Sequence, residues 1–190
     1  MKKNQLLSFA TLFLKLMCLI TIIGVLASAV MLVHWHFNPD YYAKINMVGT
    51  EGSTFGYSVK TTWATDDHAY QETPFALNNI KPLSLYLIYI QLSAISLILF
   101  LLYVEVIRII DSVKIVQSFR KRNVSSFRKI GKLLFALSLL LSFKIVKADM
   151  GYYHGFFVHF TPLILMLTAF ILSEIFKEGN ALLEENKFTV

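Results

Sequence analysis

The sequence is poor in cysteine and in charge, and both shortages exclude classes of protein. Cys18 is the only cysteine among 190 residues, so an intramolecular disulfide, a Cys-x-x-Cys redox pair and a thiolate zinc site are excluded. Charged residues make up 16% of the chain and hydrophobic residues 56%, whereas an ordinary soluble domain has about 25% and about 45–50%. The composition therefore indicates a membrane protein.

Catalytic motifs are absent as well. The sequence contains no Ser-His-Asp arrangement, no glycine-rich phosphate loop and no metalloprotease motif. Its long apolar stretches leave no room for a soluble catalytic domain, which typically takes about 100–150 residues. We therefore expect a protein that is not an enzyme, with no catalytic residues and no bound cofactor.

Apolar stretches of membrane-relevant length occupy residues 6–33, 83–107, 130–146 and 156–175. They predict an all-α integral membrane protein with four transmembrane helices, forming a single domain over residues 1–190. The third span is the weakest, because it can cross only if Lys132 and Lys144 snorkel to opposite interfaces. Ala27-Ser28-Ala29 resembles a signal-peptidase site, and cleavage there is the alternative to the retained first helix that we expect.

The basic residues are concentrated in one segment, which sets the predicted orientation. Residues 108–132 carry eight Lys or Arg against one Asp, whereas residues 36–82 carry three Lys against five acidic residues. Short basic loops stay in the cytoplasm. We therefore expect a cytoplasmic basic loop at 108–132, an outer loop at 36–82, and both termini in the cytoplasm, with a cytoplasmic tail at 176–190.

The outer loop has a strand-like pattern. Tyr57, Val59, Thr61, Trp63 and Thr65 alternate with smaller or more polar residues, which predicts a strand with one aromatic and β-branched face. Residues 44–48 are its expected partner, in a small extracytoplasmic β-hairpin-like cap. Aromatic residues near the predicted outer boundary, typical of an interfacial belt, are Trp35, Tyr41, Tyr42, Tyr152 and Tyr153.

Local signals predict where the helices begin and end. Pro82 is suited to the first position of the second helix, and Asn123 to the cap of the third. Gly179 is placed to end the fourth helix. Pro162 falls inside the fourth predicted span, where it would kink the helix because it lacks a backbone donor.

Two sets of ionisable residues are candidates for chemistry. The histidines on the predicted outer side suit a metal or haem role, but His154 and His159 are five apart and cannot chelate from one helix face. The candidate histidines are His34, His36, His154 and His159. Lys15 and Glu105 are intramembrane charges that could pair with each other or serve ion or solute transport. For Glu105, a pair with Arg108 is the simpler explanation.

The basic loop and the tail are candidates for binding a partner or lipid. Their charges could form a weak latch between loop and tail, or contact anionic headgroups or an acidic partner. The residues concerned are Arg120, Lys121, Arg122, Arg128, Lys129, Glu184 and Glu185. Topology determination alone is the simpler alternative for the loop. Direct nucleic-acid binding is not expected, because no recognition fold accompanies the charge.

Two segments resemble a known family. The first is Phe119, Asn123, Val124, Phe127, Arg128, Ile130 and Gly131; the second is Ile175-Phe176-Lys177-Glu178-Gly179, Leu182, Glu184-Glu185 and Phe188-Thr189-Val190. Together they resemble the bacterial four-helix membrane family called domain of unknown function 2975. The resemblance implies a bacterial cytoplasmic membrane protein of unassigned chemistry. Because members are often encoded beside small helix-turn-helix regulators, it also implies a regulatory partnership by association.

The leading hypothesis is thus a non-enzymatic, multi-pass membrane protein that binds a cytoplasmic partner or senses a signal through residues 108–132 and the tail. One alternative is a small transport protein that uses Lys15 and Glu105. A second is a metal- or haem-dependent redox protein that uses the outer histidines. The sequence leaves the oligomeric state open, and a homo-oligomer is among the alternatives.

Overall fold

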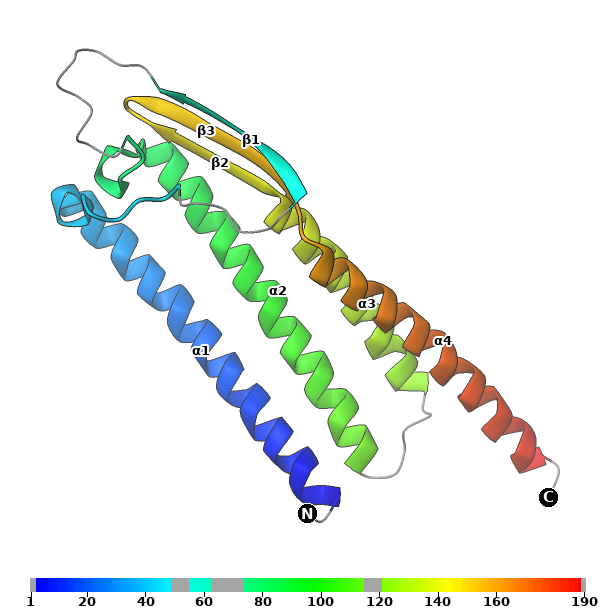
Figure 1. The fold of residues 1–190 in the computed structure, drawn as a ribbon. Helices are drawn as coiled ribbons and strands as arrows, with labels where there is room; N and C mark the ends of the chain where they lie inside the picture. The colour runs from blue at the N-terminus through cyan, green and yellow to red at the C-terminus, as the bar shows by residue number, and fades with distance from the viewer. Residues whose placement is uncertain (1–2, 49–54, 63–73, 115–120, 189–190) are drawn as a thin grey trace. The chain divides into compact units, whose positions relative to one another are not determined.

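The structure, a computed structural model, describes residues 3–48, 55–62, 74–114 and 121–188. The described residues form long helices and short strands (Figure 1). In chain order the main elements are α1 (Lys3–Phe37), η1 (Pro39–Tyr42), β1 (Phe55–Thr62), η3 (Leu77–Asn79), α2 (Pro82–Lys114), α3 (Lys121–Ser142), β2 (Phe143–Ala148), β3 (Gly151–Val158) and α4 (Phe160–Phe188). As predicted, Pro82 begins the second long helix, at the position where its missing donor costs no hydrogen bond.

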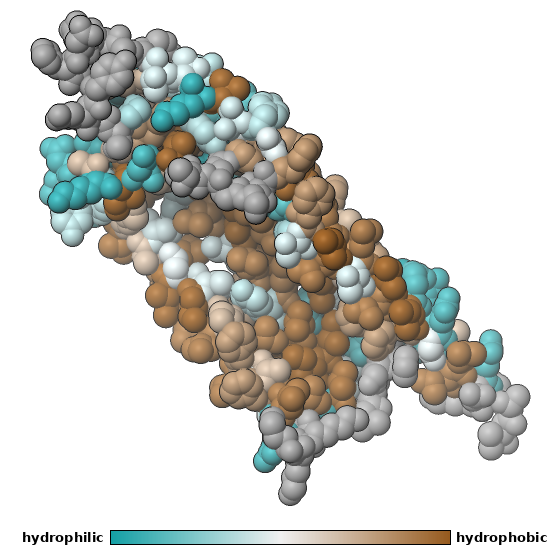
Figure 2. All heavy atoms as spheres, in the orientation of Figure 1, coloured by the Kyte–Doolittle hydropathy of each residue, from teal (hydrophilic) through white to brown (hydrophobic). Residues whose placement is uncertain are grey.

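Among the described residues, three helices are long and apolar enough to cross a membrane: Gln5–Phe37, Pro82–Lys114 and Phe160–Glu185. Many of their large apolar side chains are exposed, and Figure 2 shows such side chains along the helices in brown. This is compatible with a membrane protein, as predicted. The fourth predicted transmembrane helix is not confirmed, because Arg128, Lys129 and Lys132 interrupt the apolar pattern of α3.

The third and fourth predicted spans have wrong boundaries. The expected span 130–146 ends early, because α3 stops at Ser142 and the following residues form β2. The expected span 156–175 begins too soon, because residues 156–158 belong to β3 and α4 starts at Phe160. A short apolar run is compatible with either a helix or a strand. Hydropathy alone could not separate the two at Phe143 or Phe156.

Three local predictions about helix ends are also wrong. Pro162 is the third residue of α4 rather than an interior residue, so its missing donor removes no intrahelical hydrogen bond and gives no reason for a kink. Gly179 does not end α4, which continues to Phe188. Asn123 lies inside α3, and its side chain bonds Ser112 instead of capping the helix.

The chain divides into two compact units. We call residues Ile23–Ile95 and Leu139–His159 the sheet unit. Residues Met1–Ile22, Ser96–Ser138 and Phe160–Val190 form the second, which we call the charged unit. The helices α1, α2 and α3 contribute residues to both.

The strands of the sheet unit form an antiparallel sheet in the order β1-β3-β2. Register pairs Tyr57 of β1 with Phe156 of β3, and Phe143 of β2 with the same residue. A strand was predicted over 57–65, and β1 occupies 55–62; Trp63 and Thr65 lie outside the described residues. The expected partner 44–48 is wrong, because β1 pairs with β3, whereas Asn46 forms an isolated bridge with Ala76.

One face of the sheet lies in the core of the sheet unit. Val146, Ala148, Tyr153 and Phe157 are buried there, together with residues of α1 and η3. The indole Nε1–H of Trp35 donates a 2.8 Å hydrogen bond to the carbonyl of Leu77, so the ring is buried without an unpaired donor.

The predicted aromatic belt is therefore only partly a surface feature. Tyr41 and Tyr152 are exposed, but Trp35, Tyr42 and Tyr153 lie in the core. Tyr42 is held there by a 2.9 Å hydrogen bond to Nδ1 of His34. Residue type at a predicted boundary could not distinguish rings that face lipid from rings that pack inward.

The side chain of Gln91 on α2 provides hydrogen-bond donors at the end of α3. Its Nε2 donates hydrogen bonds to the carbonyl oxygens of Leu140, at 2.6 Å, and Phe143, at 2.8 Å. The last carbonyls of any helix lack intrahelical partners, and in an apolar environment each such group is costly to leave unpaired. The α2 side chain therefore stabilises the change from helix to strand.

We expect Gln91→Leu to lower the free energy of unfolding by about 1–3 kcal/mol, because it removes the donor that the Leu140 and Phe143 carbonyls share. For a chain of this size, that corresponds to a fall in melting temperature of roughly 2–4 °C per kcal/mol. Thermal unfolding in detergent, followed by tryptophan fluorescence, measures it. Ser93→Ala is the matched control, because the buried Ser93 Oγ has no hydrogen-bond partner; equal losses in both variants would contradict this role of Gln91.

Candidate partner-binding site

The carboxylate of Glu105 lies at the centre of the polar contacts of the charged unit. The residue is only 5% exposed. Its Oε1 accepts from Nη1 of Arg108 at 2.5 Å and from Nζ of Lys129 at 3.1 Å, and its Oε2 accepts from the Ser126 hydroxyl at 2.9 Å. A buried carboxylate is tolerated when such partners compensate its charge. Glu105 therefore ties α2 to α3.

Further polar contacts join α3 to α2 and α2 to α1. Asn123 is buried, and its Nδ2 donates to Oγ of Ser112 at 2.9 Å. On the α1 side, Nζ of Lys114 donates to Oγ1 of Thr11 at 2.9 Å. The helices of the charged unit are thus joined by specific hydrogen bonds in addition to apolar packing.

These partners of Glu105 were missed by the sequence analysis, although a signal was present. Asn123, Ser126 and Lys129 are spaced by three along α3, so they share one face of that helix. Glu105 and Ser112 have the matching helical spacing on α2. Two polar stripes of this kind in neighbouring helices predict an interhelical contact, which the charges taken one by one do not.

The basic segment and the end of α4 are joined by exposed ion pairs. Nζ of Lys121 lies 3.0 Å from Glu184 Oε1, with side chains 78% and 52% exposed. Nη2 of Arg128 lies 2.8 Å from Glu174 Oε1, with side chains 49% and 54% exposed. Glu174 also pairs with Lys177 one turn along α4. Of the other predicted binding residues, Arg122 and Glu185 are exposed, and Arg120 lies outside the described residues.

Besides these ion pairs, α3 and α4 are held together by apolar packing. The rings of Phe127 and Phe176 lie 5.0 Å apart between centroids. Gly131 leaves no room for a side chain, since a Cβ there would meet Phe170 Cε1 at 2.7 Å. The hydroxyl of Ser173 donates to the carbonyl of Val124 at 3.3 Å. The α3–α4 contact therefore has an apolar centre and exposed charged pairs.

The other candidate residues do not form a comparable site. Lys15 is exposed on α1, while the contacts of Glu105 are those with Arg108, Lys129 and Ser126. His34 and His36 lie in the last turn of α1, His154 lies in β3 rather than in the fourth helix, and His159 lies between β3 and α4. Within the described ranges, no three His, Cys, Asp or Glu residues are grouped to hold a metal ion.

These observations define a mostly helical chain with membrane-compatible helices, a small sheet and an ion-paired α3–α4 contact. A family model described as protein of unknown function (DUF2975) matches residues 57–190, which is more than half of the chain. The chain therefore belongs to this family, as the resemblance predicted. Comparison with curated proteins and with solved structures finds no match.

The two segments that carry the family resemblance contact each other. Asn123, Val124, Phe127 and Gly131 of the first lie on α3, and Phe176 and Glu184 of the second lie on α4. Phe127 packs against Phe176 across this contact. Of the residues that carried the resemblance, Phe119, Thr189 and Val190 lie outside the described residues. The family pattern thus coincides with the α3–α4 contact of the charged unit.

We expect Glu105→Ala to lower the free energy of unfolding by about 1–3 kcal/mol, because Ser126 loses its buried acceptor and two cations lose their partner. Glu105→Gln keeps an acceptor for Ser126 and should cost less. Asp111→Asn, at the exposed pair with Lys114, is the control and should stay within about 0.5 kcal/mol. Denaturant titration in detergent measures all three, and equal effects at positions 105 and 111 would contradict a central role for Glu105.

Proposed function

We propose that this chain is a non-enzymatic, multi-pass protein of the bacterial cytoplasmic membrane that binds a cytoplasmic partner through the α3–α4 contact. Its role would be regulatory or signal-sensing. The observation that carries the proposal is the pair of exposed salt bridges, Lys121–Glu184 and Arg128–Glu174, over an apolar α3–α4 contact. Lys121, Arg128 and Glu184 fall within the two stretches that also carry the family pattern, and Glu174 directly precedes the second stretch.

The pairing of β1 with β3 supports four membrane crossings. β1 follows α1 along the chain and β3 precedes α4, yet the two strands are hydrogen-bonded neighbours. They must lie on the same side of the membrane, so the chain between them must cross an even number of times. With α2 as one crossing, α3 would be the other. Lys129 and Lys132 near its start would then snorkel to the headgroups.

In this proposal the basic segment would be cytoplasmic. Residues 108–132 have the excess of Lys and Arg that is typical of cytoplasmic loops. With four crossings, both termini and the end of α4 would share that side. This arrangement agrees with the contacts of Thr11 with Lys114 and of Lys121 with Glu184.

The exposed ion pairs between α3 and α4 are weak enough for a partner to replace one member of a pair. A surface ion pair contributes only about 0–1 kcal/mol, so an acidic partner can compete with Glu184 for Lys121 without separating Phe127 from Phe176. A small helix-turn-helix regulator, which the family resemblance suggests, would be such a partner. Anionic lipid headgroups are the competing ligand for the same cations. No observation favours the transport and redox alternatives over this proposal.

The topology is tested by thiol labelling of intact cells in a Cys18→Ser background. We expect a membrane-impermeant maleimide to label Asp149→Cys, between β2 and β3, but not Ser125→Cys in α3. After cell lysis, both should react. Labelling of both sites in intact cells, or of Ser125→Cys alone, would overturn the proposed orientation.

Partner binding is tested by a photo-crosslinking amino acid at position 125, an exposed site beside the basic residues. We expect a protein crosslink that is lost in Lys121→Glu/Arg122→Glu and strengthened in Glu184→Lys, because the latter frees Lys121. Glu178→Lys is the matched control: it makes the same charge change at an exposed site on α4 and should leave the crosslink unchanged. Crosslinks to lipid alone, or a yield insensitive to these charges, would contradict the proposal.

A further inference from the structure

The two faces of the sheet have unlike surroundings. Side chains that alternate along β2 and β3 point either into the core, as Val146 and Tyr153 do, or outward. On β2 and β3, the outward set is Phe143, Ile145, Lys147, Tyr152, His154 and Phe156. Register adds Tyr57, Val59 and Thr61 of β1 to the same face. The aromatic and β-branched strand face predicted from the sequence is thus the outward one.

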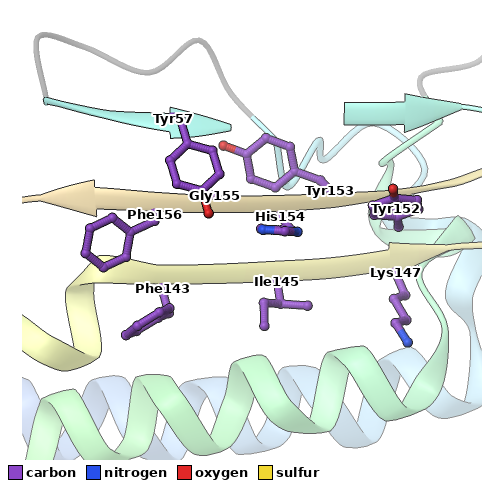
Figure 3. Close-up of a pocket in the computed structure, with 9 residues that line it drawn as sticks. All are labelled: Tyr57, Phe143, Ile145, Lys147, Tyr152, Tyr153, His154, Gly155 and Phe156. Carbon is purple, nitrogen blue, oxygen red and sulfur yellow. The ribbon is translucent and has the colours of Figure 1, made fainter. Parts of the chain in front are cut away.

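This outward face changes character along the strands. At one end, Tyr57, Phe156 and Phe143 form a row across the three strands, with the Phe143 and Phe156 rings 5.2 Å apart. At the other end, the corresponding row is Thr61, Tyr152 and Lys147. Figure 3 shows Phe143, Ile145 and Lys147 in succession along β2. The face is therefore aromatic at one end and carries an amino group and hydroxyl groups at the other.

The aromatic end is exposed and hollowed. Tyr57 is 58% exposed, and Phe143 and Ile145 are each 54% exposed. With Phe156 and His154, these residues line a hollow of about 360 Å³, whose lining continues to Tyr152 and Lys147 at the other end of the face. The outer face of an antiparallel sheet in a soluble protein is usually polar, and a contiguous exposed apolar patch marks an interaction site.

The same end is continuous with the surface of a helix that can cross a membrane. A groove of about 250 Å³ is lined by Leu87 of α2, Leu139 of α3, and Phe143 and Ile145 of β2. Leu87 is 54% exposed and lies within the apolar span of α2. Within the sheet unit, a mostly apolar groove, with Gln91 as its polar member, thus connects α2 to the aromatic end of the sheet.

We propose that the outward face of the sheet binds membrane phospholipid. The row of Phe143, Phe156 and Tyr57 lies at the boundary between acyl chains and headgroups, where aromatic rings are favoured. Lys147 and Tyr152 face the phosphate and the water beyond it. The length of the strand from Phe143 to Lys147 is about 13 Å. This length exceeds the thickness of the headgroup layer, which is roughly 5–8 Å on each side of a bilayer. The inference rests on the proposed membrane insertion but not on partner binding.

Spin labels on single cysteines in a Cys18→Ser background test this. The labelled positions are 143, 145 and 147, and the protein is reconstituted in vesicles of phosphatidylethanolamine with a minor share of phosphatidylglycerol. Each label is measured for collision with oxygen, which concentrates in acyl chains, and with a water-soluble nickel chelate. Leu97→Cys, exposed in the middle of α2, reports whether that helix is in lipid.

We expect the ratio of oxygen to nickel collisions to be high at 97 and to fall several-fold from 143 through 145 to 147. A low ratio at all three strand positions, with a high ratio at 97, would overturn the lipid-binding face and leave the membrane placement intact. Poor access of both reagents at 143 and 145 would mean that protein, such as a second copy, covers the face, and would also overturn it. A low ratio at 97 would refute the membrane insertion itself.

Discussion

In an apolar environment a backbone carbonyl must find a hydrogen-bond partner, and this requirement governs where α3 can end. Residue 143 is the point at which the helix becomes a strand, and Gln91 supplies the donors for two carbonyls there. Because the helix ends at this residue, Phe143 and Ile145 enter the sheet, and β3 can pair with both β2 and β1. One amide side chain on α2 thus binds the point at which helical and sheet structure meet.

In the charged unit, a buried charge has to be compensated, and ion pairs do this. Glu105 is buried, and its charge is compensated by cations whose side chains reach it from both α2 and α3. By contrast, the pairs that join α3 to α4 are exposed to solvent. Burial makes the first set costly to break, and exposure makes the second set easy to exchange. The unit therefore combines a buried carboxylate between α2 and α3 with exposed ion pairs between α3 and α4.

Much of this could be predicted from the sequence, and the failures have physical causes. Long apolar runs identified α1 and most of α2, because a continuous apolar segment of that length has few other structures. Residues 143–146 and 156–158 were assigned to helices, because their alternation is short and both alternating sets are largely apolar. The contact of Glu105 with Ser126 and Lys129 depends on which faces of two helices meet, a tertiary property that neither segment contains alone.

The pairing of β1 with β3 also has a consequence for biosynthesis. The two strands are separated in sequence by both α2 and α3. At a synthesis rate of about 5–20 residues per second, β1 is made several seconds before its partner exists. During that interval its backbone groups and its aromatic side chains have no sheet to join. The sheet can therefore close only after α2, α3 and β2 have been made, so β3 is the segment that completes it.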